Sequence, residues 1–296
     1  MFGSKPRLAD IGQALRPYQW LKNLLIAVPA VAGHDFRLET AKTLFLAFVA
    51  YSLCASAAYT INDVLDREHD RKHPYKKARP FASGKLTPVF GYFLAACLFI
   101  TALAICLLGL PKMFALVLSG YFGLTLAYST YIKPRLMMDV VVLACLYGLR
   151  VVAGGVAVHV PLSQWLIAFC IFFFLFLALV KRIAELEMAA PEQDTQVAGR
   201  GYRSEDWHAL QTLASAAGFV SALVLFLYLN SDAVKALYRQ PLMLWGLEPI
   251  LIYWIGRTVL IAGRGEMQED PVIFAVTDKA SLVAGALILV FLILSI

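Results

Sequence analysis

Long apolar stretches separated by short polar segments make up almost the whole chain. About nine of these stretches approach or exceed the roughly 20 residues that an α-helix needs to cross the hydrocarbon core of a membrane. They lie near residues 21–36, 40–62, 88–108, 112–130, 136–158, 162–180, 207–229, 242–262 and 279–296. The pattern predicts an all-α integral membrane protein. The first span is the least regular, because it is short and contains Pro29.

The composition supports this class of protein. Of 296 residues, 60% are hydrophobic and 16% are charged, whereas soluble domains carry about 25% charged residues. The segment VPAVAG, residues 28–33, is compatible with a signal-peptidase site, but further apolar spans follow it, so we interpret it as part of a retained helix. All five Cys residues lie in apolar spans, without the spacing of a metal site or a disulfide framework. We expect residues 1–296 to form a single polytopic membrane domain.

Basic residues are distributed unevenly between the two ends of the spans. If the N-terminus is cytoplasmic, most of the 26 Lys and Arg residues fall in cytoplasmic segments, as is usual for membrane proteins. The opposite side holds only Arg37, Lys42, Lys112, Lys235 and Arg239. We therefore predict a multi-pass protein of a bacterial-type plasma membrane, with a cytoplasmic N-terminus and a cytoplasmic functional site. The net charge of +6 collects at helix ends, where it suits lipid headgroups or phosphates better than nucleic acid.

The densest charge cluster reads NDVLDREHDRKHPYKKARP, residues 62–80, and directly follows an apolar span. If the helix continues past Asn62, the spacing of Asp63, Asp66 and Asp70 places the three carboxylates on one stripe. Asn62 shares a face with Asp66. Carboxylates one turn apart repel one another unless a cation lies between them. Because Mg²⁺ is usually held by one or two carboxylates and by substrate phosphates, the stretch predicts a site for Mg²⁺ and a phosphate, next to the basic residues that follow a break at Pro74.

Each of these polar groups also has a structural explanation. The acids after residue 62 could form a solvated helix end that pairs with the neighbouring residues Arg67, Arg71 and Lys72. Lys133, in the segment YSTYIKPR, is either a lysine that extends to the membrane surface or a substrate contact. Asp139 and Arg150 lie on one side of a predicted helix, roughly 16 Å apart, with Tyr147 on a nearby face. They either join a structural network across helices or line a wet cavity.

The pattern N-D-x-x-D-x-x-x-D after the second span, followed by K-x-R-P, resembles the first acidic motif of the UbiA superfamily of intramembrane prenyltransferases. The resemblance implies a helical bundle of this size with a central cavity that faces the cytoplasm. It also implies a second acidic motif, after the sixth helix, that helps to hold a diphosphate through Mg²⁺. The chain departs from the family there, because in place of D-x-x-x-D it has LVKRIAELEM, with Lys181, Arg182, Glu185 and Glu187. Two cations with one or two carboxylates suit a monophosphate better.

Within the superfamily, the chain is similar to the decaprenyl-phosphate phosphoribosyltransferase branch almost from end to end. The similarity is carried by RPYQWLKN, NDVLDREHDRKHPYKKARP, YIKPRLMMDV, YGLRVVAGGVA, PLSQW, KRIAEL and EDPVIFAVTDKAS. It implies transfer of a 5-phosphoribosyl group from phosphoribosyl pyrophosphate to a polyprenyl phosphate of the decaprenyl type, with release of pyrophosphate and with Mg²⁺ as the cofactor. The lipid tail would lie in an apolar groove open to the bilayer.

The resemblance also implies roles for individual residues. The expected metal ligands, in the first or an outer layer, are Asn62, Asp63, Asp66 and Asp70. The donor phosphates would contact Lys77, Arg79, Lys133 and Arg150. The acceptor phosphate would contact Lys22, Lys181 and Arg182. Further substrate contacts are expected at Tyr128, Asp139, Tyr147 and Glu185, and the candidate catalytic residues among all of these are Asp63, Asp66, Lys133 and Arg150.

Two other functions remain open on the sequence alone. An ordinary UbiA-type prenyltransferase would join a prenyl diphosphate to an aromatic or other small acceptor, which the altered second acidic motif disfavours. A transporter or a non-catalytic lipid-binding protein would show inverted repeats or helices broken at matching places in two halves, and we find neither. The expected partners are the sugar donor, the polyprenyl phosphate and the membrane, without nucleic acid. The sequence leaves open whether the chain forms a homo-oligomer.

Overall fold

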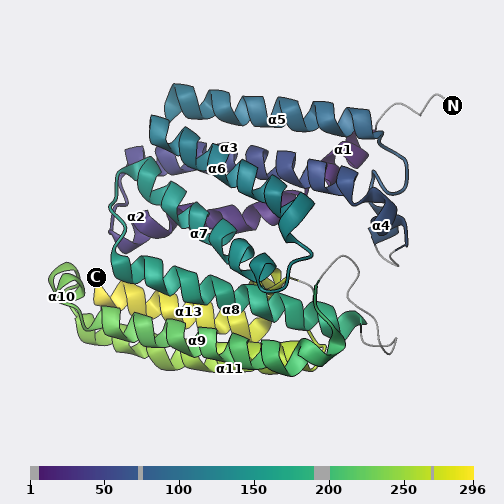
Figure 1. Ribbon diagram of the computed structural model, residues 1–296. Helices are drawn as coiled ribbons and strands as arrows, with labels where there is room; N and C mark the ends of the chain where they lie inside the picture. The colour runs from purple at the N-terminus through teal and green to yellow at the C-terminus, as the bar shows by residue number, and fades with distance from the viewer. Residues whose placement is uncertain (1–6, 73–75, 190–200, 268–269) are drawn as a thin grey trace. The chain divides into compact units, whose positions relative to one another are not determined.

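The computed structural model describes residues 7–72, 76–189, 201–267 and 270–296, which are mostly helical and contain no β-strand (Figure 1). The predicted break at Pro74 lies outside these residues. The chain divides into two compact units. The first consists of the residues up to Lys133 together with Leu149–Leu162, and the second of Pro134–Gly148 together with Ser163–Ile296. The all-α fold class is confirmed, whereas a single membrane domain stays a prediction.

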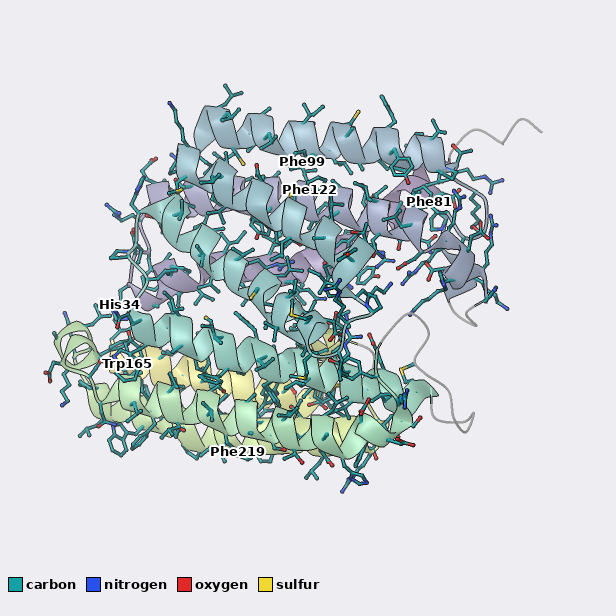
Figure 2. The ribbon with its side chains drawn as sticks, in the orientation of Figure 1. His34, Phe81, Phe99, Phe122, Trp165 and Phe219 are labelled. Carbon is teal, nitrogen blue, oxygen red and sulfur yellow. The ribbon has the colours of Figure 1, made fainter. Side chains whose placement is uncertain are left out.

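The first unit is organised around α3, a helix of 28 residues from Leu38 to Leu65. Many of its buried residues are Ala or Ser, and such small side chains let neighbouring helices approach closely. Helix α5 packs along α3, and α6 contacts both (Figure 1). Phe99 of α5 stacks on Phe122 of α6, with ring centroids 4.0 Å apart (Figure 2). The other elements are α1 (Leu8–Leu15), η1 (Pro17–Ala27), α2 (Val28–Ala32), α4 (Arg67–Lys72), η2 (Lys76–Ala78), α5 (Pro88–Gly109), α6 (Lys112–Ala127) and the π-helix η3 (Tyr128–Ile132).

Helix α7, Met138–Val158, contributes residues to both units. In the second unit, α8 runs along α9, and α11 packs against α8, α9 and α13 (Figure 1). The unit contains the part of α7 up to Gly148. Its complete elements are α8 (Gln164–Ala189), η4 (Ser204–Asp206), α9 (Trp207–Leu229), α10 (Asp232–Leu237), η5 (Pro241–Gly246), α11 (Leu247–Gly263), α12 (Pro271–Thr277) and α13 (Lys279–Ser295). The helices α3, α5, α6 with η3, α7, α8, α9, α11 and α13 confirm the predicted spans at these places, and the largest difference is at the end of α8, which runs to Ala189.

The number of membrane spans among the described residues is smaller than predicted. Seven helices are long and apolar enough to cross a membrane, or eight if the bent pair of α12 and α13 counts as one span. The missing span is the first, near residues 21–36, which forms the 3₁₀ helix η1 and the short helix α2 instead. Proline explains the difference, because it lacks the N–H that a continuous helix would need in its interior. Pro17 instead opens η1 and Pro29 lies in the first turn of α2, where a missing N–H is tolerated.

A sharp corner joins α12 to α13, whose axes differ by 79°. Asp278 lies at this corner and accepts hydrogen bonds from the backbone N–H and the hydroxyl of Ser281, at 2.8 and 2.9 Å. Its carboxylate also receives both terminal nitrogens of Arg257, at 2.6 and 3.0 Å. The carboxylate therefore caps α13 and ties the corner to α11 through charge-assisted bonds.

Candidate functional site

The acidic stretch at the end of α3 keeps the helical repeat in spite of a break at Asp66. The backbone N–H of Asp66 donates to the carbonyl of Asn62 at 2.8 Å, and that of Asp70 donates to the carbonyl of Asp66 at 2.9 Å. Helix α4 then runs to Lys72. The helical continuation predicted from the sequence is therefore present. It brings the acids to the end of α3, where distant parts of the first unit contact them.

Two of the three aspartates share an arginine. Asp70 accepts a hydrogen bond from Nη1 of Arg79 at 2.7 Å, and the same nitrogen lies 3.3 Å from Oδ1 of Asp63. Asp63 is also bound by Nε and Nη2 of Arg16, the former at 3.1 Å from Oδ2. Both carboxylates are buried, and Asp63 is only 2% exposed. Burial opposes the charge of Arg16, but the Asp63 carboxylate outweighs this effect, so the pKa of Arg16 lies above its usual value.

The third aspartate binds a lysine and an amide. Asp66 Oδ2 accepts hydrogen bonds from Nζ of Lys133 at 2.6 Å and from the side-chain amide of Asn62 at 3.1 Å. Lys133 directly follows the π-helix η3, and its backbone N–H donates to the carbonyl of Tyr128 at 3.0 Å. Such π-helical turns are frequent at functional sites. Lys133 therefore pairs with an acid of the predicted metal site.

The neighbouring basic residues do not neutralise these acids. Arg67 and Arg71 instead bind Glu68, with nitrogen–oxygen distances of 3.3 and 3.0 Å. The alternative that the aspartates pair with Arg67, Arg71 and Lys72 at a solvated helix end is therefore wrong for the two arginines, and Lys72 forms no ion pair with these acids among the described residues. The ion pairs of the three aspartates among the described residues join them to Arg16, Arg79 and Lys133.

The cluster fits a divalent cation only together with further ligands. Among the described residues, no group of three or more His, Cys, Asp or Glu side chains could hold a metal ion. Asp66 is the most accessible acid of the stripe, because its side chain is 21% exposed and that of Lys133 is 22% exposed. One or two carboxylates with substrate phosphates is the usual Mg²⁺ arrangement in proteins. The residues thus fit Mg²⁺ that arrives with a phosphate, and not a cage made by the protein alone.

The remaining candidates of the first unit differ in accessibility. Lys77, in η2, is exposed, whereas Arg79 is partly buried against the acids. Tyr128, at the start of η3, is also partly buried. Lys22 lies in η1 and is only 6% exposed. Of these predicted phosphate contacts, Lys77 is therefore the one open to solvent.

Arg150 binds polar and aromatic side chains inside the first unit. Its Nε donates to Oδ1 of Asn23 at 2.9 Å, and its Nη2 donates to the hydroxyl of Tyr121 at 3.0 Å. The guanidinium also lies over the rings of Tyr51 and Tyr121, 5.6 and 4.9 Å from their centroids. Asn23 in turn donates to Ser52 at 3.0 Å. Because these partners are side chains of the protein itself, they favour the structural explanation of Arg150 over a substrate contact.

We expect Arg150→Met to lower the melting temperature by several degrees. Two hydrogen bonds to a charged group contribute about 3–6 kcal/mol together, whereas removing the charge from the membrane recovers at least about 2.5 kcal/mol. The loss also leaves the side chains of Asn23 and Tyr121 without this partner. Thermal unfolding in detergent, measured with and without the sugar donor, tests this. A normal melting temperature with lost donor binding would instead identify Arg150 as a phosphate contact.

A second buried cluster lies in the second unit, around Arg182 of α8. Nη1 of Arg182 binds the carboxylate of Glu185, and its Nε lies 3.4 Å from Oδ2 of Asp139. The hydroxyl of Tyr202 donates to Oδ1 of Asp139 at 2.6 Å and accepts from the backbone N–H of Met137 at 3.2 Å. Asp139 and Arg182 are 0% and 1% exposed. Arg182 is therefore enclosed between two carboxylates.

Lys181 and Tyr147 differ from Arg182 in their surroundings. Lys181 is only partly buried on α8. Tyr147 stacks on Phe174, with ring centroids 5.5 Å apart, which is a packing contact.

Burial, and then the hydrogen bond to Asp139, raise the pKa of Tyr202 above its usual value, so its hydroxyl stays a donor at neutral pH.

Sequence reasoning missed several side chains of these clusters that bind the predicted residues directly through hydrogen bonds. They are Arg16, Asn23, Tyr121 and Tyr202. Arg16 and Asn23 belong to the segment RPYQWLKN, which we noted only for its similarity and for Lys22. Nothing local identifies their partners, because Arg16 lies 47 residues from Asp63 and Asn23 lies 127 residues from Arg150.

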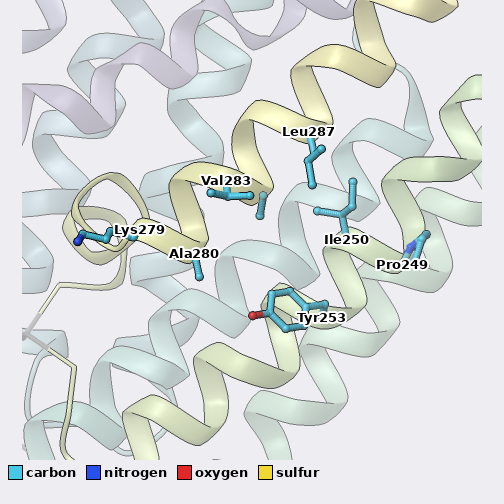
Figure 3. A pocket seen from close by; sticks show the side chains of 8 residues that line it. Pro249, Ile250, Tyr253, Lys279, Ala280, Val283 and Leu287 are labelled. Atoms are coloured by element: carbon cyan, nitrogen blue, oxygen red, sulfur yellow. The ribbon is translucent and has the colours of Figure 1, made fainter.

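A groove with a volume of about 570 Å³ lies between α11 and α13 (Figure 3). Its walls are apolar except at one end, and they are formed by Pro249, Ile250, Tyr253, Lys279, Ala280, Val283, Ala284 and Leu287. Val283 and Leu287 are 60% and 45% exposed. The apolar, accessible walls of the groove suit contact with an apolar chain.

Three relatives are similar to this chain over much of its length. It is 39% identical to the uncharacterized protein y4nM of Sinorhizobium fredii over 93% of this chain and 53% of that protein. It is 35% identical to the nodulation protein NoeC of Azorhizobium caulinodans over 92% of this chain and 88% of NoeC. It is 38% identical to the decaprenyl-phosphate phosphoribosyltransferase of Mycobacterium tuberculosis over 62% of each chain. The chain thus spans only about half of y4nM and less than two thirds of the mycobacterial enzyme.

Solved structures show the same fold at low sequence identity. A UbiA homolog from Archaeoglobus fulgidus, bound to GPP and Mg²⁺, superposes with a TM-score of 0.70 at 17% identity, over 96% of this chain and 97% of that one. Digeranylgeranylglyceryl phosphate synthase superposes with a TM-score of 0.68 at 15% identity, over 97% of this chain and 98% of that one. The sequence profile of the UbiA prenyltransferase family matches residues 23–274. The chain is a multi-pass membrane protein and belongs to the UbiA prenyltransferase family.

Proposed function

We propose that this protein transfers the 5-phosphoribosyl group of phosphoribosyl pyrophosphate to a polyprenyl phosphate and releases pyrophosphate. The observation that carries the proposal is the pair of clusters. An acidic stripe suited to Mg²⁺ lies at the end of α3. At the position where the family resemblance implies a second metal-binding motif, the chain instead has Arg182, buried between two carboxylates. The similarity to decaprenyl-phosphate phosphoribosyltransferases, at 38% identity, supports the same reaction.

For the donor, we propose Asp63 and Asp66 as metal ligands, with Asn62 and Asp70 beside them. Bound Mg²⁺ would neutralise the charge of the departing pyrophosphate. Lys133 and Arg79 already lie within hydrogen-bonding distance of these acids, so they are close enough to contact phosphate oxygens on the same metal. Their charges act on the oxygen that gains negative charge as its bond to ribose C1 breaks. Such fixed cations stabilise the transition state more than the ground state.

The acceptor needs no general base. A phosphate monoester is already ionised at neutral pH, so one of its oxygens can attack C1 as the pyrophosphate leaves. We propose Lys181 and Arg182 as its contacts, with Arg182 exchanging Glu185 for phosphate. The Nη2 atom of Arg182 is buried and has no hydrogen-bond partner among the described residues. The groove between α11 and α13 is the candidate for part of the prenyl tail.

The other predicted contacts also belong to the proposal. Lys77 and Arg150 stay candidates for donor phosphates, and Lys22 stays a candidate for a phosphate contact in the first unit. Tyr128, Tyr147 and Asp139 are proposed to shape the substrate sites without direct chemistry. We further propose that the acids face the cytoplasm in a bacterial inner membrane, because most basic residues would then be cytoplasmic.

A second candidate function is prenyl transfer from a prenyl diphosphate to an aromatic or other small acceptor. The family itself and the GPP-bound homolog of the same fold favour it. The names of y4nM and NoeC state no reaction and do not discriminate between the two functions. The altered second acidic motif supports phosphoribosyl transfer, since Arg182 occupies that position.

A donor exchange separates the two functions. Purified protein with Mg²⁺ and a polyprenyl phosphate should release pyrophosphate from phosphoribosyl pyrophosphate and form a phosphoribosylated lipid. It should release none from a prenyl diphosphate with 4-hydroxybenzoate, and the opposite result would support ordinary prenyl transfer. In the same assay, Lys181→Ala should raise the KM for the lipid phosphate about ten- to a hundredfold, and more than the KM for the donor.

A further inference from the structure

Arg16 lies at the junction between α1 and η1 in an unusual backbone conformation. Its φ and ψ angles are 51° and 56°, in the left-handed region, and Pro17 follows it. A residue with a Cβ is strained there, and the residue before a proline normally adopts an extended conformation. Strain of this kind is usually retained where the surrounding structure needs it for function. In this junction it accompanies the contact of the guanidinium with Asp63.

The contact occupies most of the capacity of the Asp63 carboxylate. Arg16 donates from Nε to Oδ2 at 3.1 Å and from Nη2 to Oδ1, and Arg79 lies 3.3 Å from Oδ1. A carboxylate offers about four lone-pair sites, so three of them are already used. The side chains of Arg16 and Asp63 are 13% and 2% exposed, which excludes most of the water that would otherwise replace either partner.

Arg16 and a divalent cation are therefore alternative counter-ions for Asp63. Arg16, Arg79 and Lys133 already pair with the three aspartates, so a cation added with all three in place brings further positive charge next to theirs. A diphosphate that arrives with the cation offsets this charge. It also offers new acceptors to a displaced guanidinium, for which paired phosphate oxygens are well-matched partners.

We propose that Arg16 exchanges partners during donor binding: it holds Asp63 until a divalent cation takes that carboxylate, and it then binds the diphosphate that the cation carries. The inference rests on the proposed metal site at Asp63 and Asp66. It makes Arg16 both a competitor of the free cation and a ligand of the diphosphate. Metal and diphosphate then bind cooperatively, because each removes the unfavourable charge that the other creates.

Arg16→Gln tests the exchange because it should change the two affinities in opposite directions. Free Mn²⁺, followed by electron paramagnetic resonance of the detergent-purified protein, should bind at least about tenfold more tightly than to the wild type, since a charge-assisted competitor is gone. Pyrophosphate, titrated at saturating Mg²⁺, should bind at least about tenfold more weakly. A purely structural arginine would weaken both affinities or neither, and either result overturns the proposal.

The control variant is Arg37→Gln. Arg37 also binds an aspartate through two nitrogens, with Asp35 oxygens at 2.8 and 2.8 Å, but its side chain is 78% exposed. Both affinities should remain at wild-type values in this variant. If Arg16→Gln does not fold, Arg16→Lys keeps the charge without the paired contact and should show the same signs with smaller changes.

Asp66→Asn separates failure of this inference from failure of the metal site. If Asp66→Asn leaves Mn²⁺ binding unchanged, the proposed metal site is wrong and Arg16 has nothing to exchange. If Asp66→Asn weakens Mn²⁺ binding but Arg16→Gln does not strengthen it, the metal site stands and the exchange is refuted.

Discussion

Asp66→Asn should reduce turnover by on the order of 10²–10³-fold, the usual effect of removing one group that stabilises charge in a transition state. The substitution keeps the size of the side chain and removes the negative charge that is proposed to hold Mg²⁺. The pair with Lys133 is about one fifth exposed and is less buried than the pair of Asp63 with Arg16, so its loss should lower the melting temperature less than the loss of that pair. Turnover at saturating Mg²⁺ and thermal unfolding together test the expectation.

Asp63→Asn should lower turnover to a similar extent but should also lower the melting temperature. Asp63 is almost fully buried between Arg16 and Arg79, and an amide cannot balance these charges. Glu68→Gln is the matched control, because Glu68 lies on the same stretch, is 62% exposed and binds only its neighbours Arg67 and Arg71 among the described residues. More than half of the wild-type rate in both aspartate variants would refute the metal site.

Gly154→Ala should destabilise the protein more than any other substitution considered, by more than the about 1–3 kcal/mol that over-packing usually costs. A Cβ at Gly154 of α7 would lie 2.0 Å from the carbonyl oxygen of Ile26 and 2.8 Å from its carbonyl carbon. These are backbone atoms of η1, which cannot rotate away as a side chain would. The backbone of η1 would have to move, and with it Asn23, which holds Arg150.

The matched control for Gly154→Ala is Gly148→Ala on the same helix. A Cβ there would meet nothing within 4 Å, and alanine is a better helix former than glycine by roughly 0.5–1 kcal/mol. We expect a folded Gly148→Ala protein with an equal or higher melting temperature. Folded yield from the membrane and thermal unfolding of both variants provide the test. Equal stability of the two variants would show that the close approach at Ile26 is dispensable.

The sequence by itself determined the class of the protein and most of its helices. Spans such as α5 and α9 could be predicted closely because an uninterrupted apolar stretch of this length has one favourable place, the membrane core, where only a helix satisfies its own backbone. The acidic stripe could also be predicted, since its spacing follows from the local helical repeat. The prediction of the first span was wrong for a local reason as well. Pro17 opens η1 and Pro29 lies in the first turn of α2, and a proline lacks the N–H that a continuous α-helix would use.

Only the tertiary structure decided which charges meet. Asp66 binds Lys133, which is 67 residues away in the sequence, and Asp63 binds Arg16, which is 47 residues away. Neither pairing produces a periodic pattern in the sequence. The sequence shows that a buried charge such as Arg150 needs a partner, because an unpaired charge is costly in a membrane. It cannot show that the partners are Asn23 and Tyr121, since helix packing brings those side chains together and many pairings satisfy the same apolar pattern.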